Sequence, residues 1–362
     1  MICSHGGMDE RKRETIRMGV VGVRHFHVFE TLRTFGRRED VEVVGVAESD
    51  RERRERLLRD HPLPCFESLD AMLDGARPDA VALHNLPSER ADTICRCAER
   101  GIHVWTDKPV ALDRDQLERV RAALADGRIA FSMNVAGGYS PVAHGLREKI
   151  RSGGIGDLVQ FVDAGQHGLK LPAAAAWERL PWELDASQSG GLIVQMAIHA
   201  ISRFLWIADS PVISISAERG NSRFPEYPRF DDHCSVTLTT AAGSKAIIQS
   251  SWLLPEGDDV HSRSLSCVVG TNGYYQAHGT GVAHGLEARK DGARDLIVTG
   301  DAPPRAFDPG DGPGRTAPDD FIAAIRGEAE PYVSPEFYLE VMRIALLGRE
   351  AAERGETIRV PA

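Results

Sequence analysis

Short apolar segments alternate with amphipathic segments along the first third of the chain. The apolar segments end in turn residues, as buried strands do, and the segments between them space apolar residues as helices do. Val28, Leu32 and Phe35, for example, share one helical face. Regular strand–helix alternation predicts a parallel sheet with helices on both faces. The predicted strands are residues 16–23, 41–49, 78–86, 103–107 and 129–135, and the predicted helices are residues 27–38, 50–60, 88–101 and 113–126.

The pattern changes after about residue 136, where strand-like segments follow one another without helices between them. This predicts an open, largely antiparallel sheet, interrupted by one long apolar helix over 191–209. We therefore expect an α/β protein with three parts: a charged, flexible tail (1–14), a dinucleotide-binding Rossmann domain (15–135), and an α/β domain for substrate binding and oligomerisation (136–362). The later predicted elements are strands at 158–167, 212–219, 234–240, 244–252 and 262–270, a loop at 301–320, and two closing helices, "DDFIAAIRG" and residues 335–355.

The length of the chain supports two domains, and its net charge restricts the classes of molecule that it could bind. The chain has 362 residues, 42% of them hydrophobic, which is too long for one ordinary core. A net charge of -10 argues against nucleic acid or an anionic membrane as partner. We see no apolar run long enough to span a membrane and no apolar signal core, so we expect a cytoplasmic protein. The six cysteines suggest no disulfide framework, and Cys95 and Cys97 point to different faces of a helix, which disfavours a metal site there.

The stretch "GVVGVRHFH" (19–27) resembles a dinucleotide-binding loop that has lost glycines. Such a loop uses three glycines, and here only Gly22 is kept, with Arg24 and His27 in the other two places. The context is favourable, because the loop follows a predicted strand and precedes a predicted helix. Glu48 ends the next strand, 21 residues after His27, where a carboxylate usually binds the adenosine ribose and favours NAD over NADP. The alternative is a plain βαβ unit with a surface Glu.

Arg24 need not abolish cofactor binding. Its guanidinium could lie against the pyrophosphate and replace a backbone contact by an ion pair. We expect Val23, His25 and Phe26 to contact the cofactor as well.

A Lys–Pro pair follows the predicted strand at 103–107. Lys108 therefore lies at the carboxyl end of the sheet, where open α/β folds bind their ligands. The alternative is a surface lysine at a turn.

Three segments resemble the Gfo/Idh/MocA oxidoreductases. "GIHVWTDKP" (101–109) is similar to their H-V-x-x-E-K-P stretch, and "SGGLIVQMAIHAISRFLW" (189–206) to G-G-G-x-L-x-D-x-G-x-H-x-x-D. Residues 333–360 resemble their C-terminal helix and tail. The resemblance implies a Rossmann domain, a second domain with a large open sheet, and NAD(P)-dependent chemistry on a hydroxyl of a sugar, inositol or related compound.

The resemblance also implies a catalytic Lys, Asp and His, which correspond to Lys108, Gln195 and His199. Within the apolar helix, Gln195, His199, Ser202 and Arg203 form one polar stripe, which could instead face water. We expect His199 to take the hydroxyl proton and Lys108 to donate a hydrogen bond to the oxygen. Gln195 can orient the substrate or His199 but offers no negative charge, so another carboxylate substitutes, or the chemistry is slow or different.

Other positions depart from the family pattern. Asn85 and Leu86 replace the Thr–Pro of T-P-N-x-x-H, Arg90 replaces its His, Asp107 replaces the Glu of E-K-P, and Ala197 replaces a Gly. We expect the first two and Asp107 to contact the cofactor.

Aromatic and imidazole groups of the second domain are candidates for substrate binding, together with Gln195 and His199. Each of them alone could instead be core or rim. They are Tyr139, His167, Trp177, Trp182 and Trp252.

The "HFH" stretch has a rival interpretation as a metal site. H-x-H after a first strand suits zinc in a barrel hydrolase. A barrel needs eight βα units and about five are present, so we expect no metal, with His25 or His27 at the cofactor or substrate entrance.

The sequence thus predicts an NAD-dependent dehydrogenase of a polyol or sugar-like substrate. The alternative is a redox-silent relative that binds NAD for lyase or hydrolase chemistry or for sensing. An open sheet with a flat outer face also predicts a homodimer or homotetramer.

Overall fold

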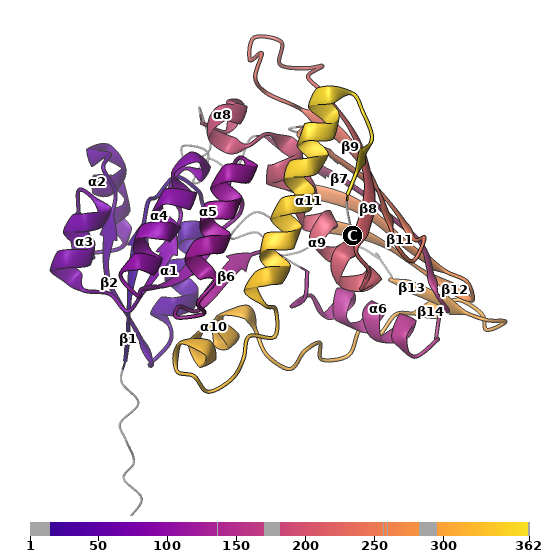
Figure 1. Cartoon of the computed structure of the whole chain (residues 1–362), viewed down its shortest axis with the longest axis horizontal. Coiled ribbons are helices and arrows are strands. Elements are labelled where there is room, and N and C mark those ends of the chain that lie inside the picture. The colour runs from indigo at the N-terminus through magenta and orange to yellow at the C-terminus, as the bar shows by residue number, and fades with distance from the viewer. Residues whose placement is uncertain are drawn as a thin grey trace, which may run out of the picture.

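The protein is seen in a computed structural model that describes residues 15–135, 137–169, 182–255, 257–258, 260–281 and 295–360. Figure 1 shows two layered parts side by side, a sheet with helices on both faces and a larger sheet with helices on one face. The predicted flexible tail (1–14) and Trp177 lie outside the described residues.

The first sheet confirms the predicted Rossmann architecture. Its six strands are all parallel, in the order β3-β2-β1-β4-β5-β6. The apolar strand β1 lies in the middle and is almost wholly buried, as a strand covered on both faces must be. The strands are β1 (Ile16–Val21), β2 (Val41–Ala47), β3 (Cys65–Phe66), β4 (Ala80–Leu83), β5 (His103–Asp107) and β6 (Phe131–Asn134).

Helices connect these strands in the predicted order. In the first of them the apolar face of Val28, Leu32 and Phe35 is buried against the sheet, as its spacing predicts. The sequence reading missed one strand–helix pair, β3 and the helix after it. The helices are α1 (His27–Gly36), α2 (Arg51–Asp60), α3 (Leu69–Ala76), α4 (Pro87–Glu99) and α5 (Arg114–Leu124).

The second sheet has nine strands in the order β14-β13-β12-β11-β7-β10-β9-β8-β15. Only β7 and β10 pair in parallel, so the prediction of a mostly antiparallel sheet is confirmed. The strands are β7 (Leu158–His167), β8 (Val212–Gly220), β9 (His233–Thr240), β10 (Lys245–Ser251), β11 (Ser262–Gly270), β12 (Gly273–Gly281), β13 (Leu296–Thr299), β14 (Arg305–Ala306) and β15 (Ile358–Arg359).

Helices cover one face of this sheet, between it and the first part (Figure 1). The apolar stretch Ala186–Ala208 is long enough to cross a membrane by length and composition, but 67% of its most apolar window is buried inside the protein. It is therefore a core segment. The elements on this side are α6 (Pro141–Arg151), the short η1 (Trp182–Leu184), α8 (Ala186–Ser189), the π-helical η2 (Ile193–Ala197), α9 (Ile198–Ala208) and α11 (Pro335–Arg354).

One late helix returns to the first sheet. In α10 (Ala317–Ile325), the ring of Phe321 packs edge-on against Phe35 and Trp105, with centroids 6.5 and 5.7 Å away. Beside it, Arg326 forms an ion pair with Asp40 at 3.0 Å. The hydrophobic core of the first part is therefore completed by residues from the end of the chain.

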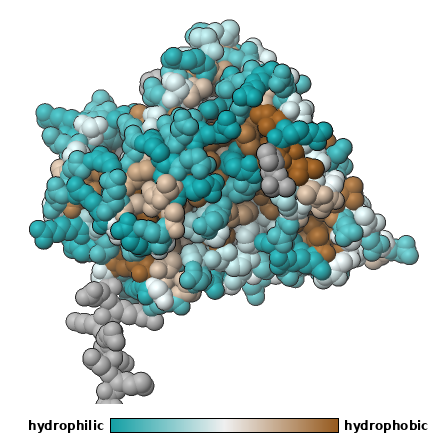
Figure 2. All heavy atoms as spheres, in the orientation of Figure 1, coloured by the Kyte–Doolittle hydropathy of each residue, from teal (hydrophilic) through white to brown (hydrophobic). Residues whose placement is uncertain are grey.

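The other face of the second sheet carries exposed apolar side chains. Ile247, Leu265 and Tyr274 are exposed on β10, β11 and β12. Strand register places Ile247 opposite Val162, and opposite residues share a face. By contrast, the view in Figure 2 shows a mostly hydrophilic surface over the helices of the first sheet.

Candidate active site

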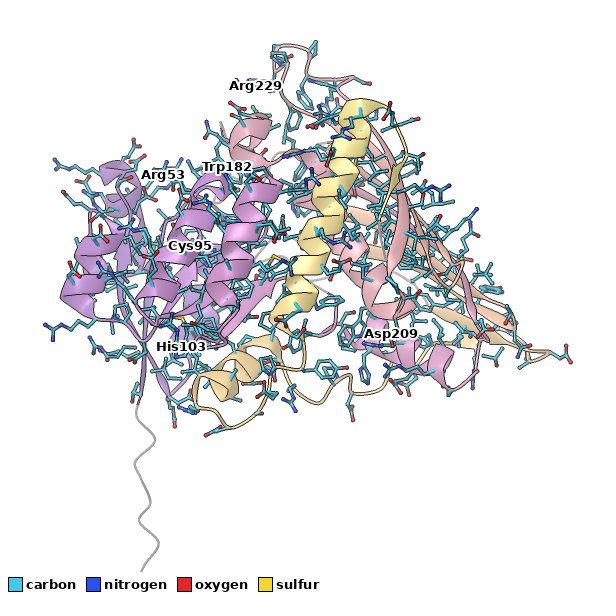
Figure 3. All side chains as sticks on the ribbon, viewed as in Figure 1. Arg53, Cys95, His103, Trp182, Asp209 and Arg229 are labelled. Carbon is cyan, nitrogen blue, oxygen red and sulfur yellow. The ribbon has the colours of Figure 1, made fainter. Side chains whose placement is uncertain are left out.

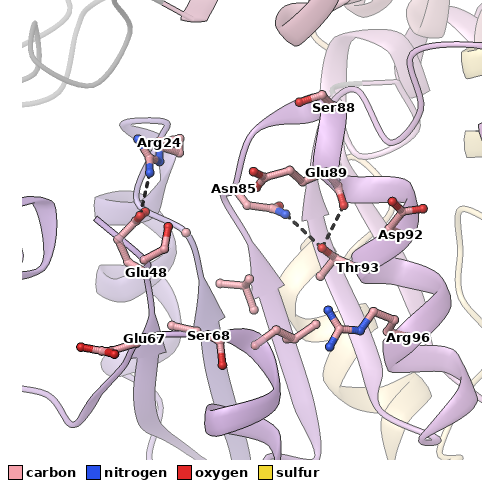
Figure 4. Close-up of a pocket in the computed structure, with 15 residues that line it drawn as sticks. Arg24, Glu48, Glu67, Ser68, Asn85, Ser88, Glu89, Asp92, Thr93 and Arg96 are labelled. Carbon is pink, nitrogen blue, oxygen red and sulfur yellow. Dashed lines mark hydrogen bonds and ion pairs between the residues drawn. The ribbon is translucent and has the colours of Figure 1, made fainter. Parts of the chain in front are cut away.

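A pocket of about 350 Å³ lies at the carboxyl edge of the first sheet, where β1, β2 and β4 end (Figure 4). Its lining includes the predicted cofactor residues Gly22, Arg24, Glu48 and Asn85. This is the position at which Rossmann folds bind a dinucleotide.

Gly22 is required by the backbone of the loop. Its φ is +79°, and a Cβ at this position would lie 2.4 Å from the Cα of Asn85. No side chain fits there, so the glycine that the sequence retains is the one that the turn between β1 and α1 demands.

Glu48 is buried beneath the loop and organises it. Its carboxylate accepts hydrogen bonds from the backbone N–H groups of Val23, at 3.0 Å, and Asp50, at 2.9 Å. The guanidinium of Arg24 pairs with the same carboxylate at 2.9 Å and lies 3.7 Å from the Asp50 carboxylate. Arg24 therefore points toward the adenosine side of the pocket, whereas we expected it to lie against the pyrophosphate.

The far wall of the pocket comes from the start of α4. The Asn85 amide donates to Thr93 Oγ1 at 3.0 Å, and its Oδ1 is buried with no hydrogen-bond partner among the described residues. Leu86 is the N-cap residue of α4, next to this wall. Burial raises the pKa of the Glu89 carboxyl, which lines the pocket with Glu48. The buried Asn85 amide oxygen and the Glu48 carboxylate thus belong to the part of the edge where Rossmann folds bind the adenosine end of a dinucleotide.

The first turn of α1 has few amide groups left for a pyrophosphate. The N–H groups of Val28 and Phe29 donate to the carbonyls of His25 and Phe26, both at 3.1 Å, and the N–H of His27 lies 3.3 Å from His25 Nδ1. The N–H groups of His27, Val28 and Phe29 are thus occupied by hydrogen bonds within the turn itself.

Lys108, which directly follows β5 at the carboxyl edge of the first sheet, contacts Gln195 of the second part. Lys108 Nζ donates to the backbone carbonyl of Gln195 at 2.7 Å and lies 3.4 Å from its side-chain Oε1. The Gln195 amide donates in turn to the carbonyl of Ser189 at 2.9 Å. Gln195 lies in the π-helical segment η2, a type of turn that is frequent at functional sites.

His199 lies one turn later and is mostly buried. Burial, and then the positive charges of Lys108 and Arg203, hold the pKa of His199 well below its usual value. The negative charge of Asp107 acts in the opposite direction. The imidazole is therefore neutral at physiological pH, and Lys108 and Asp107 are both within electrostatic range of it. Of the predicted stripe, Gln195 and Ser202 are buried, and Arg203, which is partly exposed, pairs with Asp163 at 2.5 Å.

Asp107 is fully buried, and its carboxylate lies within hydrogen-bond distance of both histidines of the H-x-H stretch. His25 Nδ1 and His27 Nδ1 lie 3.1 and 3.0 Å from the same oxygen, Asp107 Oδ2. Burial alone would raise the pKa of the Asp107 carboxyl, but the charges of the two histidines and hydrogen bonds to both rings hold it well below its usual value. Burial and the charge of His27 hold the pKa of His25 well below its usual value.

Arg90 is a site residue whose role the sequence reading missed. It is fully buried and donates hydrogen bonds to the backbone carbonyls of Lys108, at 2.5 Å, Pro109, at 3.1 Å, and Asn85, at 3.0 Å. Burial lowers the pKa of Arg90 to about 10. Arg90 thereby fixes both the Lys108 turn and the pocket wall. The presence of Arg90 where the family pattern has a histidine was the one feature of the sequence that could have pointed to this role.

An aromatic row connects the cofactor loop to the second sheet. The ring of Phe26 packs against His261, His261 against His167, and His167 against Trp252, with centroids 6.4, 5.2 and 5.9 Å apart. Two predicted substrate residues therefore lie in this row, and His261, which the sequence reading did not single out, joins them. Trp252 also lines a smaller pocket of about 100 Å³.

Two other predicted substrate residues have structural partners. Trp182 is buried where the two parts meet (Figure 3), and its indole N–H donates to the carbonyl of Arg24 at 3.0 Å. Tyr139 donates a hydrogen bond to Asp320, and its ring packs against Tyr332. The structure does not join Tyr139 to the Lys108 group.

Comparison with known proteins agrees with this architecture. Residues 16–134 match the model of an oxidoreductase family with an NAD-binding Rossmann fold, and residues 144–276 match a GFO/IDH/MocA C-terminal domain. The chain belongs to the Gfo/Idh/MocA oxidoreductase family. Its relatives include one named as NAD(+)-dependent, scyllo-inositol 2-dehydrogenase of Bacillus subtilis (strain 168), and one named as NADP(+)-dependent, a D-xylose 1-dehydrogenase.

Inositol 2-dehydrogenase of Rhizobium meliloti (strain 1021) is 24% identical, over 66% of this chain and 69% of its own length. D-xylose 1-dehydrogenase (NADP(+)) 2 of Haloferax volcanii is 23% identical, over 88% of this chain and 92% of its own. The WlbA dehydrogenase of Bordetella pertussis, solved with NADH and UDP-GlcNAcA, has the same fold, with a TM-score of 0.78 and 17% identity over 96% of this chain and 99% of that one.

Proposed function

We propose that this Gfo/Idh/MocA member is an NAD-dependent dehydrogenase that transfers hydride between the nicotinamide and a hydroxyl-bearing carbon of a sugar, inositol or similar polyol. One observation carries the proposal: Lys108, Gln195 and the neutral imidazole of His199 come together at the ligand-binding edge of the Rossmann sheet. The relatives named as inositol and xylose dehydrogenases support the substrate class.

The chain's own residues account for the proton and the charge on the reacting oxygen. Bound NAD supplies the hydride acceptor. His199 is neutral and accepts the hydroxyl proton. Lys108, held by Gln195, donates a hydrogen bond to the oxygen as negative charge develops on it. Asp107, whose charge acts on His199, stabilises the imidazolium that forms and so supplies the negative charge that Gln195 lacks.

The charge of the pocket favours NAD over NADP. Glu48, Glu67, Glu89 and Asp92 line it. Its arginines are paired, Arg24 with Glu48 and Arg96 with Asp70. A 2′-phosphate in the pocket would meet this carboxylate-rich wall.

The substrate side is proposed to be His167 and Trp252, whose aromatic faces suit a sugar ring. We also propose that the protein acts in the cytoplasm and as a homodimer or homotetramer. The five cysteines among the described residues are all free thiols, as expected in a reducing compartment.

The direct test is to incubate the purified chain with NAD, or with NADP, and a panel of polyols and aldoses, and to follow growth of the reduced-nicotinamide absorbance. We expect turnover with NAD, retained below pH 6.5 because the pKa of His199 is lowered. His199→Asn and Lys108→Met should each lower kcat by about 10²–10⁴-fold. His61→Asn serves as the matched control, because His61 directly follows α2 and its ring packs on Phe29 rather than on any residue of the Lys108 group.

The proposal fails if NAD binds and no substrate of the panel is oxidised or, in the reverse direction, reduced. That outcome would favour the redox-silent alternative. Equal kcat values for His199→Asn and the unmodified chain would remove His199 from the mechanism while leaving the dehydrogenase assignment intact.

A further inference from the structure

The two histidines of the loop after β1 and the last residue of β5 form a cluster of potential metal ligands. His25 Nδ1, His27 Nδ1 and a carboxylate oxygen of Asp107 all lie within 4.8 Å of one another. His25 and His27 follow the end of β1, and Asp107 is the last residue of β5, with only β4 between these two strands in the sheet. From the sequence, we set the H-x-H stretch aside as a metal site because the chain has too few βα units for a barrel. In the structure, Asp107 of the Rossmann sheet offers the third ligand atom.

The distances fit a transition-metal ion. Ligand bonds of about 2.0–2.2 Å place neighbouring donor atoms roughly 3.0–3.5 Å apart in tetrahedral or octahedral geometry. The two imidazole nitrogens lie 3.1 and 3.0 Å from Asp107 Oδ2, so a cation needs only small side-chain shifts to reach all three atoms.

The ligands are held in place by the rest of the fold. Asp107 Oδ1 accepts the backbone N–H of Lys108 at 2.9 Å, which leaves Oδ2 facing the imidazoles. Asp107 is fully buried and His25 is nearly so, while His27 is partly exposed and gives a route from solvent. Such fixed orientation of ligands is typical of metal sites in proteins.

We propose that His25, His27 and Asp107 bind one divalent first-row transition cation of the Zn²⁺ type. Two imidazoles and one carboxylate are the donor set of open metal sites, in which further positions remain for water or an oxygen ligand. This departs from our expectation from the sequence that no metal is bound. Asp107 also has a role in the proposed dehydrogenase mechanism, but the metal site is tested without NAD or substrate, so the failure of one proposal is distinguished from the failure of the other.

The first experiment titrates Co²⁺ into the full chain, purified without a histidine tag and stripped with a chelator, and records the visible ligand-field bands. We expect bands that saturate at one Co²⁺ per chain and disappear when Zn²⁺ is added. Absence of bands, or bands that grow without saturating at one equivalent, would show that the cluster is a hydrogen-bonded group only and would overturn the proposal.

The second experiment repeats the titration on variants whose folding is checked by circular dichroism. His27→Ala and Asp107→Asn should each weaken Co²⁺ binding by more than about 100-fold, because a lost ligand costs more than a lost supporting contact. His61→Ala should bind as the unmodified chain does. If the buried Asp107→Asn variant does not fold, His27→Ala decides alone. Unchanged affinity in His27→Ala, or an equal loss in His61→Ala, would overturn the site.

Discussion

At the residue scale, Gln195 occupies the family's aspartate position, and both ends of its side-chain amide have polar partners. Its Oε1 faces Lys108 Nζ at 3.4 Å, and its Nε2 donates to the Ser189 carbonyl at 2.9 Å. An aspartate has no group that could make the second bond. The negative charge near His199 comes instead from Asp107. Gln195 is therefore a positioning residue for Lys108.

We expect Gln195→Asp to lower kcat with a polyol substrate roughly tenfold, because a buried hydrogen bond is lost and the shorter carboxylate faces the Ser189 carbonyl. Steady-state kinetics measures the change, and Gln195→Glu, which keeps the chain length, is the control. A rise in kcat for Gln195→Asp would mean that the missing family carboxylate limits the reaction.

Individual site residues differed in how far the sequence could predict them. Lys108 and His199 follow from motifs, because their spacing from strands and helices is local. The contact of Asp107 with His25 and His27 does not, since it depends on which strands lie next to each other in the sheet. The same holds for Arg24: its pairing with Glu48 depends on the path of a turn that lacks two glycines.

At the scale of elements, the strand–helix alternation was enough to predict the Rossmann sheet, and the long apolar helix is present where it was expected, with a π-helical start that the sequence did not indicate. Residues 191–209 were expected as a single helix. The structure confirms one continuous helix from Leu192 to Ala208, which begins with the π-helical η2. Gly190 and Gly191, with φ values of +89° and +79°, separate it from α8, a short helix that the sequence reading missed. A periodicity of apolar residues does not distinguish π from α turns when nearly every side chain is buried.

Arg90 holds the start of α4 against the Lys108 turn, so replacing Arg90 should lower the stability of the protein. Arg90→Met leaves three buried carbonyls without their donor, so we expect a loss of about 2–4 kcal/mol in the free energy of unfolding. Arg96→Met is the matched control on the same helix: Arg96 is exposed, and its loss should change stability by less than about 0.5 kcal/mol. Urea unfolding measures both. Equal effects of the two changes would show that Arg90 does not brace the turn.

At the scale of the whole molecule, the uncovered face of the second sheet is the natural surface for a second copy. Ile247, Leu265 and Tyr274 are exposed on neighbouring or nearby strands of one continuous sheet, and an exposed apolar face of this kind usually marks an interface.

We expect the protein to be a dimer or tetramer whose mass falls when charge is placed on this face. Ile247→Lys combined with Leu265→Lys should shift the protein to monomers in light scattering coupled to size-exclusion chromatography. Tyr227→Lys, an exposed apolar residue in the loop between β8 and β9, is the control. A monomeric unmodified chain would contradict the prediction.

The return of α10 to the first sheet limits how this protein can be divided. A fragment cut after β6 would contain every strand of the cofactor-binding sheet, yet it would leave Phe35 and Trp105 open to water where Phe321 now packs. The two halves are consecutive along the chain but are not separable modules. Any recombination that exchanges one half between relatives has to carry the α10 segment along with the dinucleotide-binding half.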